Sequence, residues 1–152
     1  ELRMPRIIGV HLHGQLQGWA APKDVILTIL GLLTTKGGTN AIMEYFGEGT
    51  KSLSTTGKAT ICNMGAELGA TCSLFPYDDN ADEYLCQTGR EQVATMARQH
   101  AADLRADADV ELHPETYYDQ VIDLDLSMVP SHRTLPHRSL RCARKDPPAI
   151  IR

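Results

Sequence analysis

Short runs of β-branched and other apolar residues recur along the chain and predict β-strands. Ile7, Ile8 and Val10 form the first run, within Arg6 to Leu12, and a glycine ends it. The other predicted strands are Ala41 to Phe46, a short buried strand at Cys72 to Phe75, and Tyr118 to Leu126. In the last of these, apolar residues alternate with aspartates, which is typical of a strand with one solvated face.

Longer runs with helical character separate these strands. Pro22 to Thr35 is apolar nearly all round and predicts a buried helix, with Asp24 near its positive end and Gly37 after its end. After the polar stretch Thr50 to Thr56, a second helix is expected that carries Asn63 and Glu67, and a third is expected at Asp79 to Thr88.

A further helix is expected after Gly89. Thr88 and Glu91 have the spacing of a capping box at its start. Its apolar residues fall on one stripe, which predicts amphipathic packing: Val93, Met96, Ala97, Ala101 and Leu104. Since strands and helices alternate along the whole chain, the fold class is α/β, with layers of helices against a sheet.

The segment Ala59 to Phe75 is the most unusual part of the chain, because its only charged residue is Glu67. Asn63 precedes Glu67 by four residues, so both side chains would lie on one face of a helix. Nearby small residues bring the backbone close to the surface: Gly65, Ala66, Gly69 and Ala70. We expect a buried carboxylate here, which needs a partner. It is either functional or bonded to a neighbouring backbone group or histidine.

Charge is divided unevenly along the 152 residues. Residues 1–130 contain nine Lys/Arg and eighteen Asp/Glu, whereas residues 131–152 contain six Lys/Arg and one acid. A basic tail of this kind is compatible with nucleic-acid binding. However, the tail has no aromatic residues, helical period or known motif, so we expect a disordered or foreign end and no nucleic-acid partner.

Other polar residues suggest metal binding only weakly. His11 and His13 share one strand face without a third ligand nearby, and the aspartates after Tyr118 fit a solvated edge better than a cation site. The spacing of the cysteines matches neither a zinc nor an iron–sulfur ligand set, so free thiols are expected: Cys62, Cys72, Cys86 and Cys142. Cys62 and Cys72 are expected to be small core residues. No apolar run is long enough to span a membrane.

Several motifs together resemble the aconitase family, in particular the mitochondrial-type aconitate hydratases. The central motif is Ile-Cys-Asn-Met-Gly-Ala-Glu at residues 61–67. The others are Ala-Pro-Lys-Asp-Val-Ile-Leu (21–27), Leu-Thr-Thr-Lys-Gly-Gly-Thr (33–39), Glu-Tyr-Phe-Gly-Glu-Gly (44–49), Gly-Ala-Thr-Cys-Ser-Leu-Phe-Pro-Tyr (69–77) and Tyr-Tyr-Asp-Gln-Val-Ile (117–122). The resemblance implies a three-layer α/β/α domain with a mostly parallel sheet over residues 1–130, roughly the family's second domain. Residues 131–152 depart from the family pattern as an irregular basic tail.

The resemblance also implies a reaction, the interconversion of citrate and isocitrate through cis-aconitate in the tricarboxylic acid cycle, with a [4Fe–4S] cluster. Glu67 corresponds to a catalytic carboxylate that partners a histidine. Asn63 corresponds to an asparagine that hydrogen-bonds at the edge of the cluster without being a ligand.

The residues that ligate the cluster in the family, its catalytic serine and its substrate-binding arginines have no counterpart here. We therefore expect no cluster and no metal in this chain alone, and no activity from it. The resemblance implies a monomeric parent enzyme in the mitochondrial matrix, whose transit peptide is not part of this chain. Two alternatives stay open: a fragment of a related homoaconitase or isopropylmalate isomerase, and a non-catalytic binding fragment.

Overall fold

The computed structural model describes residues 3–131 and 149–151. Its strands are β1 (Arg6–His13), β2 (Ala41–Phe46), β3 (Cys72–Leu74), β4 (Gln120–Asp125) and β5 (Ala149–Ile151). Its α-helices are α1 (Pro22–Leu33), α2 (Thr55–Met64), α3 (Asp79–Gln87), α4 (Glu91–Gln99), α5 (Ala108–Leu112) and α6 (Pro114–Tyr117). Three short 3-10 helices are η1 (Glu48–Ser52), η2 (Gly65–Leu68) and η3 (Leu126–Met128).

The five strands form one sheet in the order β3-β2-β1-β4-β5. β1 pairs in parallel with β2 and with β4, and β2 pairs in parallel with β3. Only β5 runs antiparallel to its neighbour, β4. The predicted α/β class and the mostly parallel sheet are therefore confirmed.

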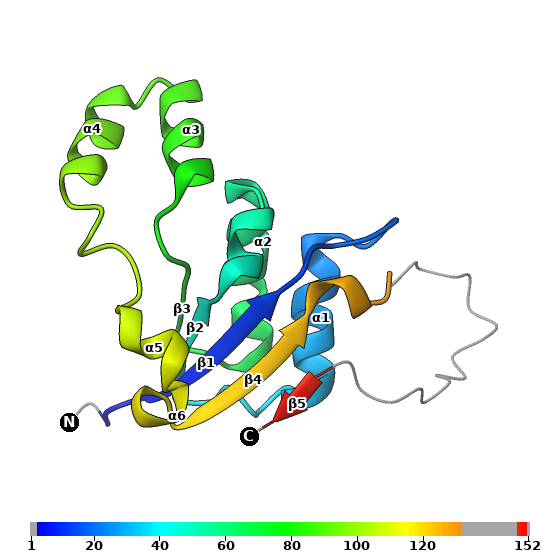
Figure 1. The fold of residues 1–152 in the computed structure, drawn as a ribbon. Helices are drawn as coiled ribbons and strands as arrows, with labels where there is room; N and C mark the ends of the chain where they lie inside the picture. Colours follow the sequence, from blue (N-terminus) through cyan, green and yellow to red (C-terminus); the bar gives the residue numbers. More distant parts are fainter. Residues whose placement is uncertain (1–2, 132–148, 152) are drawn as a thin grey trace.

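Alternation along the strands directs side chains to the two faces of this sheet. One face carries the larger core, where Ile8, Val10 and Leu12 of β1 pack with residues of α1 and α2. The opposite face carries a smaller cluster of Phe46, Val110 and Tyr118, beside α5 and α6. Figure 1 shows α1 and α2 on one side of the sheet and α5 and α6 on the other, which is a three-layer arrangement.

Local chemistry explains where α1 begins and ends. Pro22 occupies its first turn, and Asp24 Oδ2 accepts a hydrogen bond of 2.8 Å from the backbone N–H of Ala21. The helix ends at Leu33, because Thr34 has a φ of +64° and leaves the helical region. The predicted helix was correct in position and two residues too long.

Helices α3 and α4 form an arm that extends away from the sheet (Figure 1). The predicted capping box is wrong: Arg90 precedes α4 as its N-cap, and the Thr88 hydroxyl donates instead to the Tyr84 carbonyl. Only part of the predicted apolar stripe lies on α4, because the helix ends at Gln99, before Ala101 and Leu104. Val93 is 51% and Met96 63% exposed, so the stripe does not pack as expected.

The prediction of a buried strand at Cys72 to Phe75 is wrong, because β3 lies at the edge of the sheet. Cys72 and Leu74 are exposed there, and Cys62 on α2 is only partly buried. Neither cysteine is the core residue that the apolar composition of the segment predicted. The prediction was wrong because the apolar composition of a segment does not specify which strand lies at the edge of the sheet.

The predicted basic tail lies mostly outside the described residues. Within it, the structure describes Ser131 and the strand β5 at 149–151, so those three residues are not irregular. The boundary at residue 130 remains a prediction. None of the helices in residues 3–131 has the length and apolar character needed to cross a bilayer.

Candidate functional site

The predicted site residues lie where α2 passes into η2. The Ser54 hydroxyl caps the start of α2 by accepting a 3.1 Å hydrogen bond from the N–H of Gly57. The helix ends at Met64, and the chain tightens into the 3-10 turn Gly65–Leu68. Gly69 follows with a φ of +79°, a conformation that favours glycine and ends the turn.

Asn63 and Glu67 therefore do not share one continuous α-helix, as their spacing predicted. Asn63 lies in the last turn of α2, and Glu67 lies in η2. Both are exposed, so the predicted burial of the Glu67 carboxylate is wrong for this chain. Ile61, Gly65 and Leu68 take the buried positions of the segment. Within residues 3–131, neither Asn63 nor Glu67 makes a side-chain hydrogen bond or an ion pair.

The backbone that carries these two side chains is firmly held. Leu68 is fully buried, and its carbonyl accepts a 3.0 Å hydrogen bond from Gly38. The N–H of Thr71 donates to the carbonyl of Ala41 at 2.8 Å, where β2 begins. Gly65 has no room for a side chain, since a β-carbon there would lie 2.5 Å from Ser73 Oγ. The turn is thus fixed at the amino edge of the parallel sheet.

The cysteines beside this turn are not arranged as metal ligands. Burial, with a smaller contribution from Cys72, raises the pKa of the Cys62 thiol, which disfavours the thiolate that ligation requires. Among the described residues, no three His, Cys, Asp or Glu side chains are grouped to hold a metal ion. These residues therefore do not fit the ligand set of an iron–sulfur cluster.

The histidine pair lies on the sheet face opposite α1 and α2. His11 Nδ1 is 3.2 Å and His13 Nε2 is 3.1 Å from the same oxygen, Oδ1 of Asp123 on β4. The His11 ring also stacks on Phe46, with centroids 5.0 Å apart. The two histidines are thus partly exposed, share one aspartate, and belong to no three-ligand group in the described chain.

A cavity formed by described residues lies away from Asn63 and Glu67. Its volume is about 510 Å³, and it opens at the carboxyl ends of β2 and β3. Its lining comes mostly from the segments that follow these strands, with Lys51, Asp78 and Arg105 among the charged side chains. The Asn63–Glu67 turn, at the opposite edge of the sheet, lines neither this cavity nor a smaller one beside His11 and Asp123.

Sequence reasoning missed one buried charged pair. Lys58, on the inner side of α2, forms an ion pair with Asp78, which precedes α3. A signal was present, because Lys58 lies three residues before the buried Ile61 and so shares its helix face. Its partner is twenty residues away and could not be identified from spacing.

The fold and the turn together define a class: a mostly parallel α/β domain that presents one carboxamide and one carboxylate at the amino edge of its sheet. The family model for the aconitase family (aconitate hydratase) matches residues 1–144 of the chain. The chain therefore belongs to the aconitase family.

Individual relatives agree with this assignment. The mitochondrial aconitate hydratases of Emericella nidulans and Gracilaria gracilis are each 54% identical over 132 residues, which is 87% of this chain. The mitochondrial aconitate hydratase of Schizosaccharomyces pombe is 51% identical over 136 residues, or 90% of this chain. The chain spans only 16% of the length of each of these relatives.

Proposed function

We propose that this chain is the part of an aconitate hydratase that supplies Asn63 and Glu67 to the active site. The reaction is the interconversion of citrate and isocitrate through cis-aconitate, in mitochondria. The observation that carries the proposal is the identity of 54% over 132 residues and of 51% over 136 residues to mitochondrial aconitate hydratases. The iron–sulfur cluster, which would act as a Lewis acid when bound, is held by segments outside this chain.

In this proposal Glu67 holds or moves a proton with a histidine from another segment. An exposed carboxylate on a fixed turn suits this role, because it meets an incoming partner without reorganisation of the backbone. Asn63, one short turn earlier, offers an amide that donates or accepts a hydrogen bond at the same surface. The absence of a competing partner for either side chain within residues 3–131 leaves both free for these contacts.

The isolated chain, on the same reasoning, is inactive. The test is an iron assay together with a coupled isocitrate assay on the purified chain, after anaerobic incubation with iron and sulfide. The expected result is no turnover above the buffer background, with the intact enzyme of a relative as the positive control. Isocitrate production by the chain alone would contradict the proposal that essential groups come from elsewhere.

A further inference from the structure

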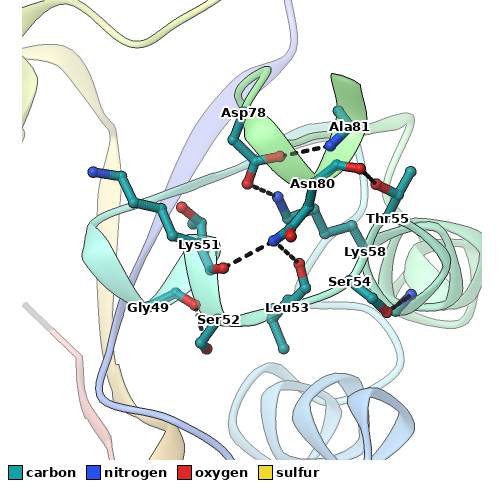
Figure 2. A network of polar contacts seen from close by, with 12 residues as sticks. Gly49, Lys51, Ser52, Leu53, Ser54, Thr55, Lys58, Asp78, Asn80 and Ala81 are labelled. Carbon is teal, nitrogen blue, oxygen red and sulfur yellow. Dashed lines mark hydrogen bonds and ion pairs between the residues drawn. The ribbon is translucent and has the colours of Figure 1, made fainter. Parts of the chain in front are cut away.

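Lys58 is a charged side chain that the fold buries almost completely. It is 6% exposed, and its ammonium Nζ makes a close ion pair with Oδ2 of Asp78 (Figure 2). The ammonium also lies 5.9 Å from the centre of the Phe75 ring. Because burying a charge is costly unless it is paired, this contact is a fixed part of the structure, unlike a surface ion pair.

The same carboxylate also begins a helix. Asp78 Oδ1 accepts a 3.0 Å hydrogen bond from the backbone N–H of Ala81, which caps the first turn of α3. One side chain therefore joins the flank of α2 to the start of α3. Any rotation of α2 about its axis would remove the ammonium from an oxygen whose position the cap determines.

Asn80, in α3, adds contacts to the segment that leads into α2 and to the first residue of α2. Its Nδ2 donates to the carbonyls of Lys51 and Leu53, at 2.9 and 3.0 Å. Its own carbonyl accepts a 2.8 Å hydrogen bond from the hydroxyl of Thr55, the first residue of α2 (Figure 2). The amino-terminal half of α2 is thus attached to α3 at two points, one of them charged.

The position of Asn63 depends on the attachment of α2 to α3, because Asn63 lies on α2. Asn63 follows Lys58 by five residues, or about 7.5 Å along a rigid α-helix. Gly57, directly before Lys58, packs against Pro22 of α1. A β-carbon on Gly57 would lie 2.8 Å from Cγ of that proline ring. Asn63 lies in the last turn of α2 and has no side-chain partner within residues 3–131, so the rotation of α2 determines where it points. Glu67 lies on η2, which begins directly after α2 ends.

We propose that Lys58 and Asp78 are positioning residues for the Asn63–Glu67 site. Their ion pair fixes the rotation of α2 and, through it, the direction of the Asn63 carboxamide and the point from which the η2 turn carries Glu67. The inference rests on the proposed function of those two residues. It adds a pair that acts on the site through α2.

The first test is hydrogen–deuterium exchange on the full chain. Asp78→Asn keeps a good capping residue and removes the charge, whereas Lys58→Met removes the other partner and keeps the length of the side chain. Each change is expected to speed amide exchange across residues 59–68 by about tenfold or more, because breaking one member of a buried pair destabilises its surroundings. Lys58→Arg, which retains the charge, is expected to exchange like the unchanged chain.

The chain offers a matched control in the exposed ion pair between Arg98 and Asp82, which joins α3 to α4. Arg98→Met should leave exchange in residues 59–68 unchanged. Far-UV circular dichroism establishes that each variant is folded, and the two independent variants keep the test decisive if one of them is not. Faster exchange confined to the first turn of α3 would overturn the proposal and reduce Asp78 to a helix cap.

The second test uses the intact enzyme and separates this inference from the proposed function. Asp78→Asn is expected to lower kcat for citrate by about tenfold with little change in KM, and Lys58→Arg to retain the rate. Glu67→Gln, measured alongside, tests the site itself. If Glu67→Gln abolishes turnover while Asp78→Asn does not affect it, the positioning role is wrong. If Glu67→Gln has no effect, the proposed function is wrong.

Discussion

At the level of single residues, Glu67 combines an exposed carboxylate with a backbone held on both sides. The buried Leu68 follows it directly, and Gly65 precedes it in close contact with Ser73. An exposed side chain on a fixed turn contributes little to folding, because its removal leaves no cavity and no unpaired group. Its chemistry and its structural cost can therefore be separated by mutation.

Glu67→Gln in the intact enzyme is expected to lower turnover by about 10²–10⁴-fold, the usual contribution of a general acid–base group. The free energy of unfolding is expected to change by less than about 0.5 kcal/mol, since the side chain is exposed. Steady-state assays and urea denaturation measure the two effects. Glu48→Gln, an exposed change on η1, is the control and should alter neither. A parallel loss of stability and rate would indicate a structural glutamate.

Asp125, at the end of β4, gives a prediction about pH. Hydrogen bonds from the hydroxyl and the N–H of Ser127 hold the pKa of this carboxyl below its ordinary value of 3.8. A carboxyl whose pKa is lower in the folded state stabilises the fold above its unfolded pKa. That stabilisation is lost as pH falls through the folded pKa. Asp125→Asn should thus reduce the acid-induced loss of stability below about pH 4. Urea midpoints at pH 7 and pH 3 measure this difference, and an unchanged difference would contradict it.

At the level of elements, β1 and the α6–β4 connection meet without space for a side chain. A β-carbon on Gly9 would lie 2.4 Å from Cδ2 of Tyr118. That ring is buried and stacks on Phe46 with centroids 5.2 Å apart, so it is unable to move aside freely. Gly9 therefore sets the distance between the sheet and its thinner helical layer.

Gly9→Ala is expected to destabilise the chain by about 1–3 kcal/mol, as overpacking of a filled site usually does. Urea denaturation of the single variant, of Tyr118→Leu and of the double variant forms a cycle. Because the clash requires both groups, the alanine should cost clearly less when the Tyr118→Leu change is already present. Additive losses would show that the glycine is needed for another reason.

Elements were predicted correctly from the sequence where the local pattern determines them. They were predicted poorly where contacts with distant segments determine the structure. β2 was predicted residue for residue, because its β-branched and aromatic run is bounded by Gly47. The prediction of a single helix through Asn63 and Glu67 was wrong. The turn after Met64 depends on the packing of Gly65 against Ser73 of strand β3, which the local pattern does not show. The predicted burial of Glu67 failed for the same kind of reason: which side of a turn faces solvent depends on tertiary contacts.

At the level of the whole molecule, the layers are complete around α1 and α2 but not elsewhere. The edge strand β3, the η2 turn and the α3–α4 arm all present surface that their sequences predicted to be covered. The chain spans 16% of the length of an aconitate hydratase relative. We expect other segments of an intact enzyme to cover this surface, because exposed apolar patches usually mark contact sites. An apolar stripe without a partner contributes little to the stability of the chain alone.

The apolar side chains Val93 and Met96 on α4 are mostly exposed, so we expect them to contribute little to folding. Val93→Gln and Met96→Gln together are expected to change the free energy of unfolding by less than about 0.5 kcal/mol, because both side chains are mostly exposed. Leu124→Ala, in the fully buried core, is the contrasting control and should cost about 2–5 kcal/mol. Urea denaturation followed by circular dichroism measures both, and light scattering should show less self-association of the glutamine variant, since apolar surface has been removed. A loss above about 1 kcal/mol from the glutamines would mean that the stripe packs within this chain after all, as its periodicity predicted. A loss only in the intact enzyme would instead identify the arm as a surface that another segment of the protein covers.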